Sequence, residues 1–108
     1  MTEKRKQTRY TTHAQARLAD VAESKVLLKD ISVTGCGIES TVFMDIKLNH
    51  RYKMEILPEE ASKIGPFEIV VEVLWTRSGG YSFEVGFAII ESPKGKQFQR
   101  YVDYLSWR

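Results

Sequence analysis

The feature that most constrains the fold is a pair of alternating segments joined by a glycine-rich turn. Apolar and polar residues alternate from residue 67 to 77 and again from 81 to 90, with Ser78-Gly79-Gly80 between them. A period of two places the apolar side chains on one face of a strand, and glycine supplies the positive φ that a tight turn requires. The sequence therefore predicts an antiparallel hairpin, and with it a fold built on β-sheet.

The same alternation recurs earlier in the chain. Residues 13–18 and 26–31 show it, and we expect them to pair across a turn near Glu23-Ser24. A short strand is expected at 36–40 and another at 52–56, which ends before Pro58 because proline cannot donate to a strand ladder. The remaining stretches, 42–48 and 58–66, are predicted to be a connector and a loop.

The tail changes period from strand to helix. Ser92 is suited to cap a helix with Pro93 at its first position, and apolar residues recur at helical spacing at Phe98, Tyr101, Val102 and Leu105. This predicts a helix of about residues 93–107. Short strands plus one terminal helix favour an all-β fold, a small antiparallel six-stranded β-barrel with a C-terminal α-helix, because closing a sheet removes its edges.

Length and composition indicate a single small domain. The chain has 108 residues, 43% of them hydrophobic and 28% charged, as in ordinary globular proteins. We expect a flexible basic arm at 1–12 and a barrel domain at 13–108. The N-terminus lacks the apolar core of a signal peptide, no stretch is apolar enough to span a membrane, and Cys36 is the single cysteine. A cytoplasmic location is the expectation.

Charge is concentrated at the N-terminus. The net charge is only +2, yet the first 17 residues hold five basic residues against one acidic residue, Glu3. A basic arm on a nearly neutral body suits a small polyanion better than a long duplex, which would need a wider basic face.

Two short sequence motifs, the first of them on this arm, indicate which kind of anion the protein binds. Arg5 and Arg9 stand four residues apart, and Asp30-Ile31-Ser32-Val33-Thr34-Gly35 follows about twenty residues later. A guanidinium can grip phosphate oxygens or the O6/N7 edge of guanine bidentately. The second motif offers a carboxylate that can accept from the guanine N1–H and N2–H₂ edge, a hydroxyl, and a glycine that permits close approach of backbone. Together the motifs predict a site for guanine plus phosphate.

At this point the sequence resembles the PilZ domain, a bacterial receptor module for the second messenger cyclic di-GMP. Its signature is RxxxR followed by (D/N)xSxxG, and both occur here without substitution. Val73-Leu74-Trp75 and Glu84-Val85-Gly86-Phe87 also stand where the family has a strand ending in tryptophan and a strand with a Gly-Phe pair. The resemblance implies the barrel architecture, cyclic di-GMP as ligand, and signalling to a protein partner in motility, attachment or virulence.

The resemblance also implies roles for single residues. Arg5 and Arg9 would grip guanine and phosphate, Asp30 and Ser32 would hold a guanine or ribose edge, and Gly35 would shape the strand end. Three further positions are secondary candidates. Lys4 replaces an arginine common in members that bind a stacked ligand pair, Arg77 is expected to be a solvated strand end within reach of a phosphate, and Gly86 is expected to permit a bulge or tight bend.

Other chemistries find little support in the sequence. We expect Trp75 to lie in the core or at the barrel rim and Cys36 to pack as a small hydrophobic residue. His13 and His50 lack partners at metal-ligand spacing, so no metal site is predicted. The sequence contains no recognisable set of nucleophile, base and orienting group, so neither an enzyme nor a cofactor is predicted. Two alternatives stay open: a small barrel that binds single-stranded nucleic acid, and a PilZ module that only contacts proteins.

Overall fold

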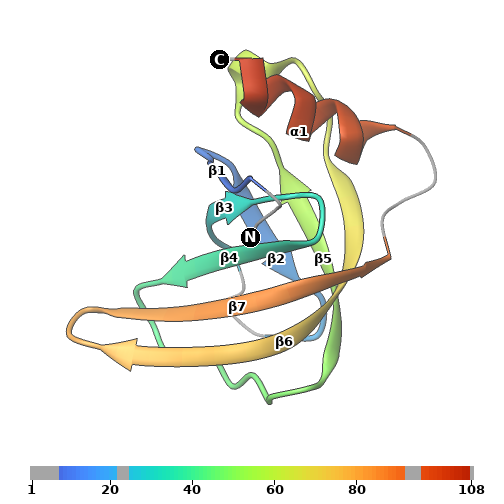
Figure 1. The fold of residues 1–108 in the computed structure, drawn as a ribbon. Helices are drawn as coiled ribbons and strands as arrows, with labels where there is room; N and C mark the ends of the chain where they lie inside the picture. Colours follow the sequence, from blue (N-terminus) through green and yellow to red (C-terminus); the bar gives the residue numbers. More distant parts are fainter. Residues whose placement is uncertain (1–7, 22–24, 92–95, 108) are drawn as a thin grey trace, which may run out of the picture.

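Strands form the wall of the molecule, and one helix covers an end of it (Figure 1). The computed structural model describes residues 8–21, 25–91 and 96–107. Its strands are listed in chain order: β1 (Tyr10–Thr11), β2 (Gln15–Leu18), β3 (Lys25–Ile31), β4 (Gly35–Ser40), β5 (Arg51–Leu57), β6 (Phe67–Gly79) and β7 (Ser82–Glu91). A 3-10 turn, η1 (Glu60–Ser62), lies before β6, and the helix is α1 (Gln97–Trp107).

The sheet closes on itself. Antiparallel pairing runs from β2 through β3, β4, β7, β6 and β5 and returns to β2, and β1 adds to β3 outside this ring. Full closure leaves no continuous free edge, which protects a small β-protein from edge-to-edge association. The predicted all-β, six-stranded antiparallel barrel with a C-terminal helix is confirmed.

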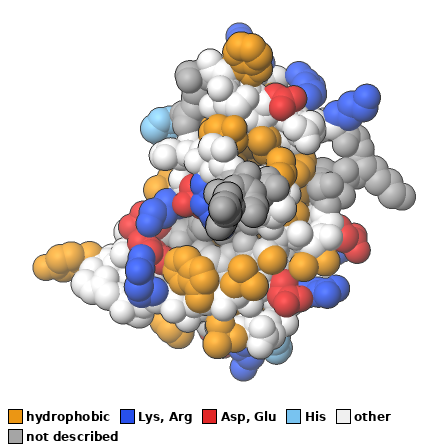
Figure 2. All heavy atoms as spheres, in the orientation of Figure 1, with side chains coloured by type: hydrophobic (Ala, Val, Ile, Leu, Met, Phe, Trp, Pro, Cys, Tyr) orange, Lys and Arg blue, Asp and Glu red, His pale blue; other side chains and the backbone are white. Residues whose placement is uncertain are grey.

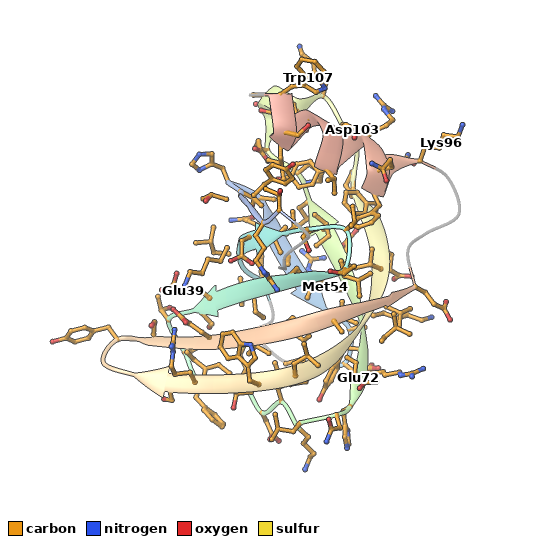
Figure 3. All side chains as sticks on the ribbon, in the orientation of Figure 1. Glu39, Met54, Glu72, Lys96, Asp103 and Trp107 are labelled. Carbon is orange, nitrogen blue, oxygen red and sulfur yellow. The ribbon has the colours of Figure 1, made fainter. Side chains whose placement is uncertain are left out.

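The interior contains the apolar side chains that the alternation predicted. Buried side chains alternate along β2, at Val26 and Leu28 in β3 and at Met54 and Ile56 in β5. Leu28 and Met54 are fully inaccessible to solvent, and Met54 is labelled in Figure 3. The helix packs its apolar stripe onto this core, and the rings of Phe98 and Tyr101 lie 6.1 and 6.0 Å from that of Phe67. Trp107, at the end of the helix, points away from the barrel (Figure 3).

Several boundaries differ from the sequence-based ones. The turn of the β6–β7 hairpin is shorter than predicted, because β6 continues through Gly79. Of the two turn glycines, Gly80 has a left-handed conformation, with φ 59°. The helix begins at Gln97 rather than near 93, and Lys96 directly before it is a bend. The expected Ser92 cap and the Glu23-Ser24 turn lie outside the described residues. No helix in the described part of the chain is long and apolar enough to cross a membrane.

Strand pairing begins before residue 13, although the ring itself starts with β2. Tyr10 and Thr11 pair with Ile31 and Asp30, so the end of the expected arm is a strand. Thr12 is buried, its backbone N–H donates to the Lys29 carbonyl at 3.2 Å, and its hydroxyl donates to the Leu28 carbonyl at 2.5 Å. These bonds fix the chain directly after Arg9 against β3.

Candidate ligand-binding groove on the barrel wall

Four residues from four strands form one row across the outside of the barrel. Asp30 of β3 is paired with Gly37 of β4, Gly37 with Gly86 of β7, and Gly86 with Trp75 of β6. Side chains in such a row point to the same face of a sheet. The two glycines therefore make a strip of backbone without side chains, and the Asp30 carboxylate and the Trp75 indole ring lie against its two ends.

Neighbouring groups occupy the space that a side chain at these glycines would need. A Cβ at Gly37 would lie 3.1 Å from a carboxylate oxygen of Asp30, and one at Gly86 would lie 2.3 Å from the Trp75 ring. At Gly35 a Cβ would lie 2.8 Å from the Phe87 carbonyl oxygen and 3.2 Å from a guanidinium nitrogen of Arg9. At Gly35 the close group is backbone and at Gly86 it is an aromatic ring, so a side chain at either position would force a shift, whereas at Gly37 a small movement of the Asp30 side chain would make room.

The carboxylate of the second motif meets an arginine of the first. Arg9 Nη1 donates to Asp30 Oδ1 at 2.7 Å, and both side chains are partly exposed. The pairing of β1 with β3 explains the contact. It places Thr11 opposite Asp30, and Arg9, directly before β1, is therefore held close to the same carboxylate. Two residues distant in sequence are thus joined at the edge of the glycine strip.

Ser32 and Gly35 build the turn between β3 and β4. The Ser32 hydroxyl accepts from the backbone N–H groups of Thr34 and Gly35 at 3.2 and 3.1 Å, and the Ser32 N–H donates to the Gly35 carbonyl at 2.8 Å. Ser32 is 2% exposed, so its hydroxyl faces the turn rather than the groove. Gly35 is not among the described residues with positive φ; its lack of a side chain serves close approach to β7.

A second charged cluster lies further along the same groove. The Glu84 carboxylate accepts hydrogen bonds from Lys29 at 3.1 Å and from Arg77 at 2.5 Å. The bond from Arg77 contributes most, and the bond from Lys29 next, to lowering the pKa of the Glu84 carboxyl. The Arg77 guanidinium also lies 5.6 Å from the centre of the Trp75 ring. The groove has a volume of about 310 Å³. It is lined by the Arg9–Asp30 pair, by the cluster around Glu84, and by Gly37 and Gly86.

Figure 2 shows basic and acidic side chains side by side on this face, with hydrophobic side chains next to them over β7 and β6. A surface of this kind, with charged donors, a carboxylate and an exposed aromatic ring around bare backbone, suits a planar ligand that carries negative charge.

Comparison with known proteins identifies the family. The model of the PilZ domain matches residues 3–106, nearly the whole chain. The chain belongs to the PilZ domain family. The resemblance inferred from the two motifs is confirmed, and comparison with curated protein sequences gave no match.

Two solved structures have the same fold. The structure of the Bacillus subtilis inhibitor of motility, MotI/DgrA, superposes with a TM-score of 0.79 at 18% identity and covers 99% of this chain and 51% of its own. This PilZ chain thus spans about half the length of that protein. The PilZ domain of YcgR from Escherichia coli, described with c-di-GMP, superposes with a TM-score of 0.69 at 19% identity and covers 97% of this chain and 93% of its own.

The PilZ groove contains some of the residues that the sequence indicated and some that it did not. Arg9, Asp30, Arg77 and Gly86 line it, Gly35 lies next to it, and Ser32 is turned away. Arg5 and Lys4 lie outside the described residues. The lining residues that were not predicted as site residues include Lys29, Gly37, Trp75 and Glu84. A second glycine two positions after Gly35 places both glycines on one face of the strand, and this signal could have indicated Gly37.

Three expectations about single residues can be compared with the structure. Trp75, expected in the core or at the barrel rim, is 45% exposed on the outer face and therefore does not lie in the core. One of the two register shifts between β6 and β7, at Val73 and Trp75, lies opposite Phe87 and Gly86, where a bulge was expected, and Gly86 also leaves room for the indole ring. Cys36 is buried, and burial, with the nearby Asp30 charge, raises the pKa of its thiol to about 12.

Proposed function

We propose that this PilZ protein is a receptor that binds cyclic di-GMP in the groove and catalyses no reaction. The observation that carries the proposal is the Arg9–Asp30 pair, 2.7 Å long, at the edge of a glycine strip on the outer wall. The family membership supports it, as does the fold shared with a PilZ domain described with c-di-GMP.

Each group around the strip can recognise a different part of this ligand. The Arg9 guanidinium can contact a phosphate or a guanine edge, and the Asp30 carboxylate can accept from guanine N–H groups. Gly37 has no side chain, which lets a ligand approach the sheet next to Asp30, whereas Gly86 is covered by the Trp75 indole. The exposed indole of Trp75 offers a stacking surface at the other side of the strip.

The remaining motif residues have different proposed roles. Arg5 is proposed as a second ligand arginine on the basis of the motif alone. For Ser32 we propose a shaping role, because its hydroxyl is bonded within the β3–β4 turn and that turn sets the position of Asp30. Ligand stoichiometry depends on Lys4, which keeps positive charge but lacks the bidentate fork.

The output we propose is a change in the surface presented to a protein partner. Wrapping of the basic N-terminal segment around a dianion would order it and alter that surface. One structural neighbour is described as an inhibitor of motility, which supports motility as the first process to examine. We propose that this signalling takes place in the cytoplasm, where the single cysteine would remain reduced.

Calorimetry with four ligands tests the proposal. Cyclic di-GMP should bind with micromolar or tighter affinity, about −8 kcal/mol at that level, whereas GTP, cyclic GMP and a short single-stranded oligonucleotide should bind much more weakly. Saturable binding of the oligonucleotide alone would favour a nucleic-acid-binding barrel. No binding of any of the four would favour a PilZ module that contacts only proteins.

Two variants test the groove as the site. Loss of a charge-assisted hydrogen bond costs about 1.5–3 kcal/mol, so Arg9→Ala should weaken binding roughly tenfold to a hundredfold and reduce its salt dependence. Asp30→Ala should weaken binding but keep the salt dependence. Arg51→Ala is the matched control, because Arg51 makes a cross-strand pair with Glu72 at 3.1 Å and does not line the groove. Unchanged affinity in Arg9→Ala would contradict the assignment.

A further inference from the structure

Glu84 contacts two basic side chains at once. Its Oε2 accepts from Lys29 Nζ at 3.1 Å and its Oε1 from Arg77 Nη2 at 2.5 Å. The carboxylate is 13% exposed, whereas the Lys29 and Arg77 side chains are 46% and 68% exposed. The acid therefore lies against the wall, and the two cations extend from it toward solvent.

The sheet register explains why the cations collect there. Glu39 of β4 lies directly opposite Glu84 of β7, and Arg77 of β6 lies opposite Glu84 on the other side. Two carboxylates on neighbouring strands repel each other unless cations lie between or beside them. Lys29 and Arg77 supply that charge.

This cluster shares the groove with the Arg9–Asp30 pair. Along β7, Glu84 is two residues from Gly86, and along β6, Arg77 is two residues from Trp75, so the cluster forms the next row on the same outer face. Among the described lining residues three basic side chains face two carboxylates. An anionic ligand that enters must compete with those carboxylates for the same donors.

We propose that Glu84 is an internal counterion that holds Lys29 and Arg77 in the free protein, and that both cations transfer to a ligand phosphate to form a second phosphate subsite. The inference rests on the proposed cyclic di-GMP function and adds residues outside the two motifs. On binding, Lys29 and Arg77 exchange their contacts with the Glu84 carboxylate for contacts with the ligand phosphate. Because the carboxylate competes for these two cations, it lowers the affinity for the ligand. Glu84 then sets how strongly the groove binds dianions.

The central experiment measures cyclic di-GMP affinity in Glu84→Gln. The amide keeps the shape and a hydrogen-bond acceptor but removes the competing charge, so binding should tighten roughly threefold to tenfold and become more dependent on salt. Glu55→Gln is the matched control: it removes the same charge from the Arg17 pair, 3.7 Å long, across β2 and β5 on the opposite wall. Its affinity should equal that of the wild type.

A second set of variants separates competition from a general charge effect. Lys29→Gln and Arg77→Gln together should weaken binding, and in that background Glu84→Gln should give no gain, because no cation remains to be released. A gain that persists without both cations, or affinity in Glu84→Gln that matches Glu55→Gln or falls below the wild type, would overturn the proposal. Thermal melting of each variant checks that the barrel remains folded.

The design also distinguishes this inference from the proposed function. If the wild-type protein binds cyclic di-GMP and Glu84→Gln changes nothing, only the counterion role fails. If the wild-type protein binds no cyclic di-GMP, the proposed function fails, and inorganic pyrophosphate becomes the probe. Tighter pyrophosphate binding by Glu84→Gln than by Glu55→Gln would then support release of the two cations, and equal binding would overturn it.

Discussion

At the scale of single residues, the position of Trp75 depends on the absence of a side chain at Gly86. A Cβ there would lie 2.3 Å from the indole ring, so Gly86→Ala should force the ring off the strip. We expect a loss of stability of about 1–3 kcal/mol, as for overpacking, together with weaker cyclic di-GMP binding. Tryptophan emission in a Trp107→Phe background reports the movement of Trp75 directly.

The control for this substitution is Gly79→Ala on the same hairpin. Nothing lies within 4 Å of a Cβ at Gly79, so emission, stability and binding should remain close to those of the parent protein. If Gly86→Ala kept the parent emission spectrum, the ring would not rest on Gly86 as described.

Cys36 gives a second prediction at this scale. Burial raises the pKa of its thiol from 9.0 to about 12, so the reactive thiolate is almost absent from the folded protein at pH 8. Labelling by iodoacetamide at pH 8 should therefore be very slow until denaturant unfolds the barrel. Because the unfolded thiol ionises first, stability should fall as the pH rises from about 9 toward 12. Rapid labelling of the folded protein would place Cys36 outside the core.

At the scale of elements, β1 divides the N-terminal segment into two parts that should respond differently to ligand. Tyr10 and Thr11 pair with β3, and Thr12 is buried and hydrogen-bonded, so amides 10–12 should be protected from hydrogen exchange without ligand. Residues 1–9 contain few apolar anchors in the sequence, and we expect them to gain protection only when cyclic di-GMP binds.

Hydrogen exchange with and without the ligand tests this division, and Asp30→Ala serves as the control with reduced binding. Equal protection of residues 1–9 in both states would reject the proposed ordering of the arm even if binding itself is observed. Loss of protection at 10–12 in the free protein would show that β1 does not anchor the segment.

At the scale of the whole molecule, closure of the sheet links the groove to global stability. Its floor comes from β3, β4, β7 and β6, which are four of the six strands in the ring, so a ligand on it should stabilise the barrel as one unit. At a free ligand concentration of about 100 times Kd the gain is about 2.7 kcal/mol, which corresponds to a rise in Tm of roughly 10 °C for a domain of this size.

Differential scanning calorimetry should show a single transition that moves upward with cyclic di-GMP concentration. Arg9→Ala should show a much smaller shift at the same concentration, because its affinity is lower. Two separate transitions, with only one of them sensitive to ligand, would contradict a barrel that unfolds cooperatively.

The sequence predicts the six strands of the ring, the terminal helix and the PilZ family, but not β1, which it assigned to the arm. Those features depend on local patterns: alternation in β2, β3 and β5, helical spacing from Phe98 to Leu105, and two short motifs. The two motifs indicated that Arg9 and Asp30 belong to one site. Only the fold shows that the two side chains form an ion pair.

The tertiary structure decided which side chains share the groove. Alternation from Phe67 through Val73 favoured a core or rim position for Trp75, but the register shift after Val73 places its side chain on the outer face. Strand register then places Gly37, Gly86 and Trp75 in one row, although they lie far apart in sequence. Register and bulges depend on contacts between strands, and for that reason local patterns could not show the glycine strip or the cations on Glu84.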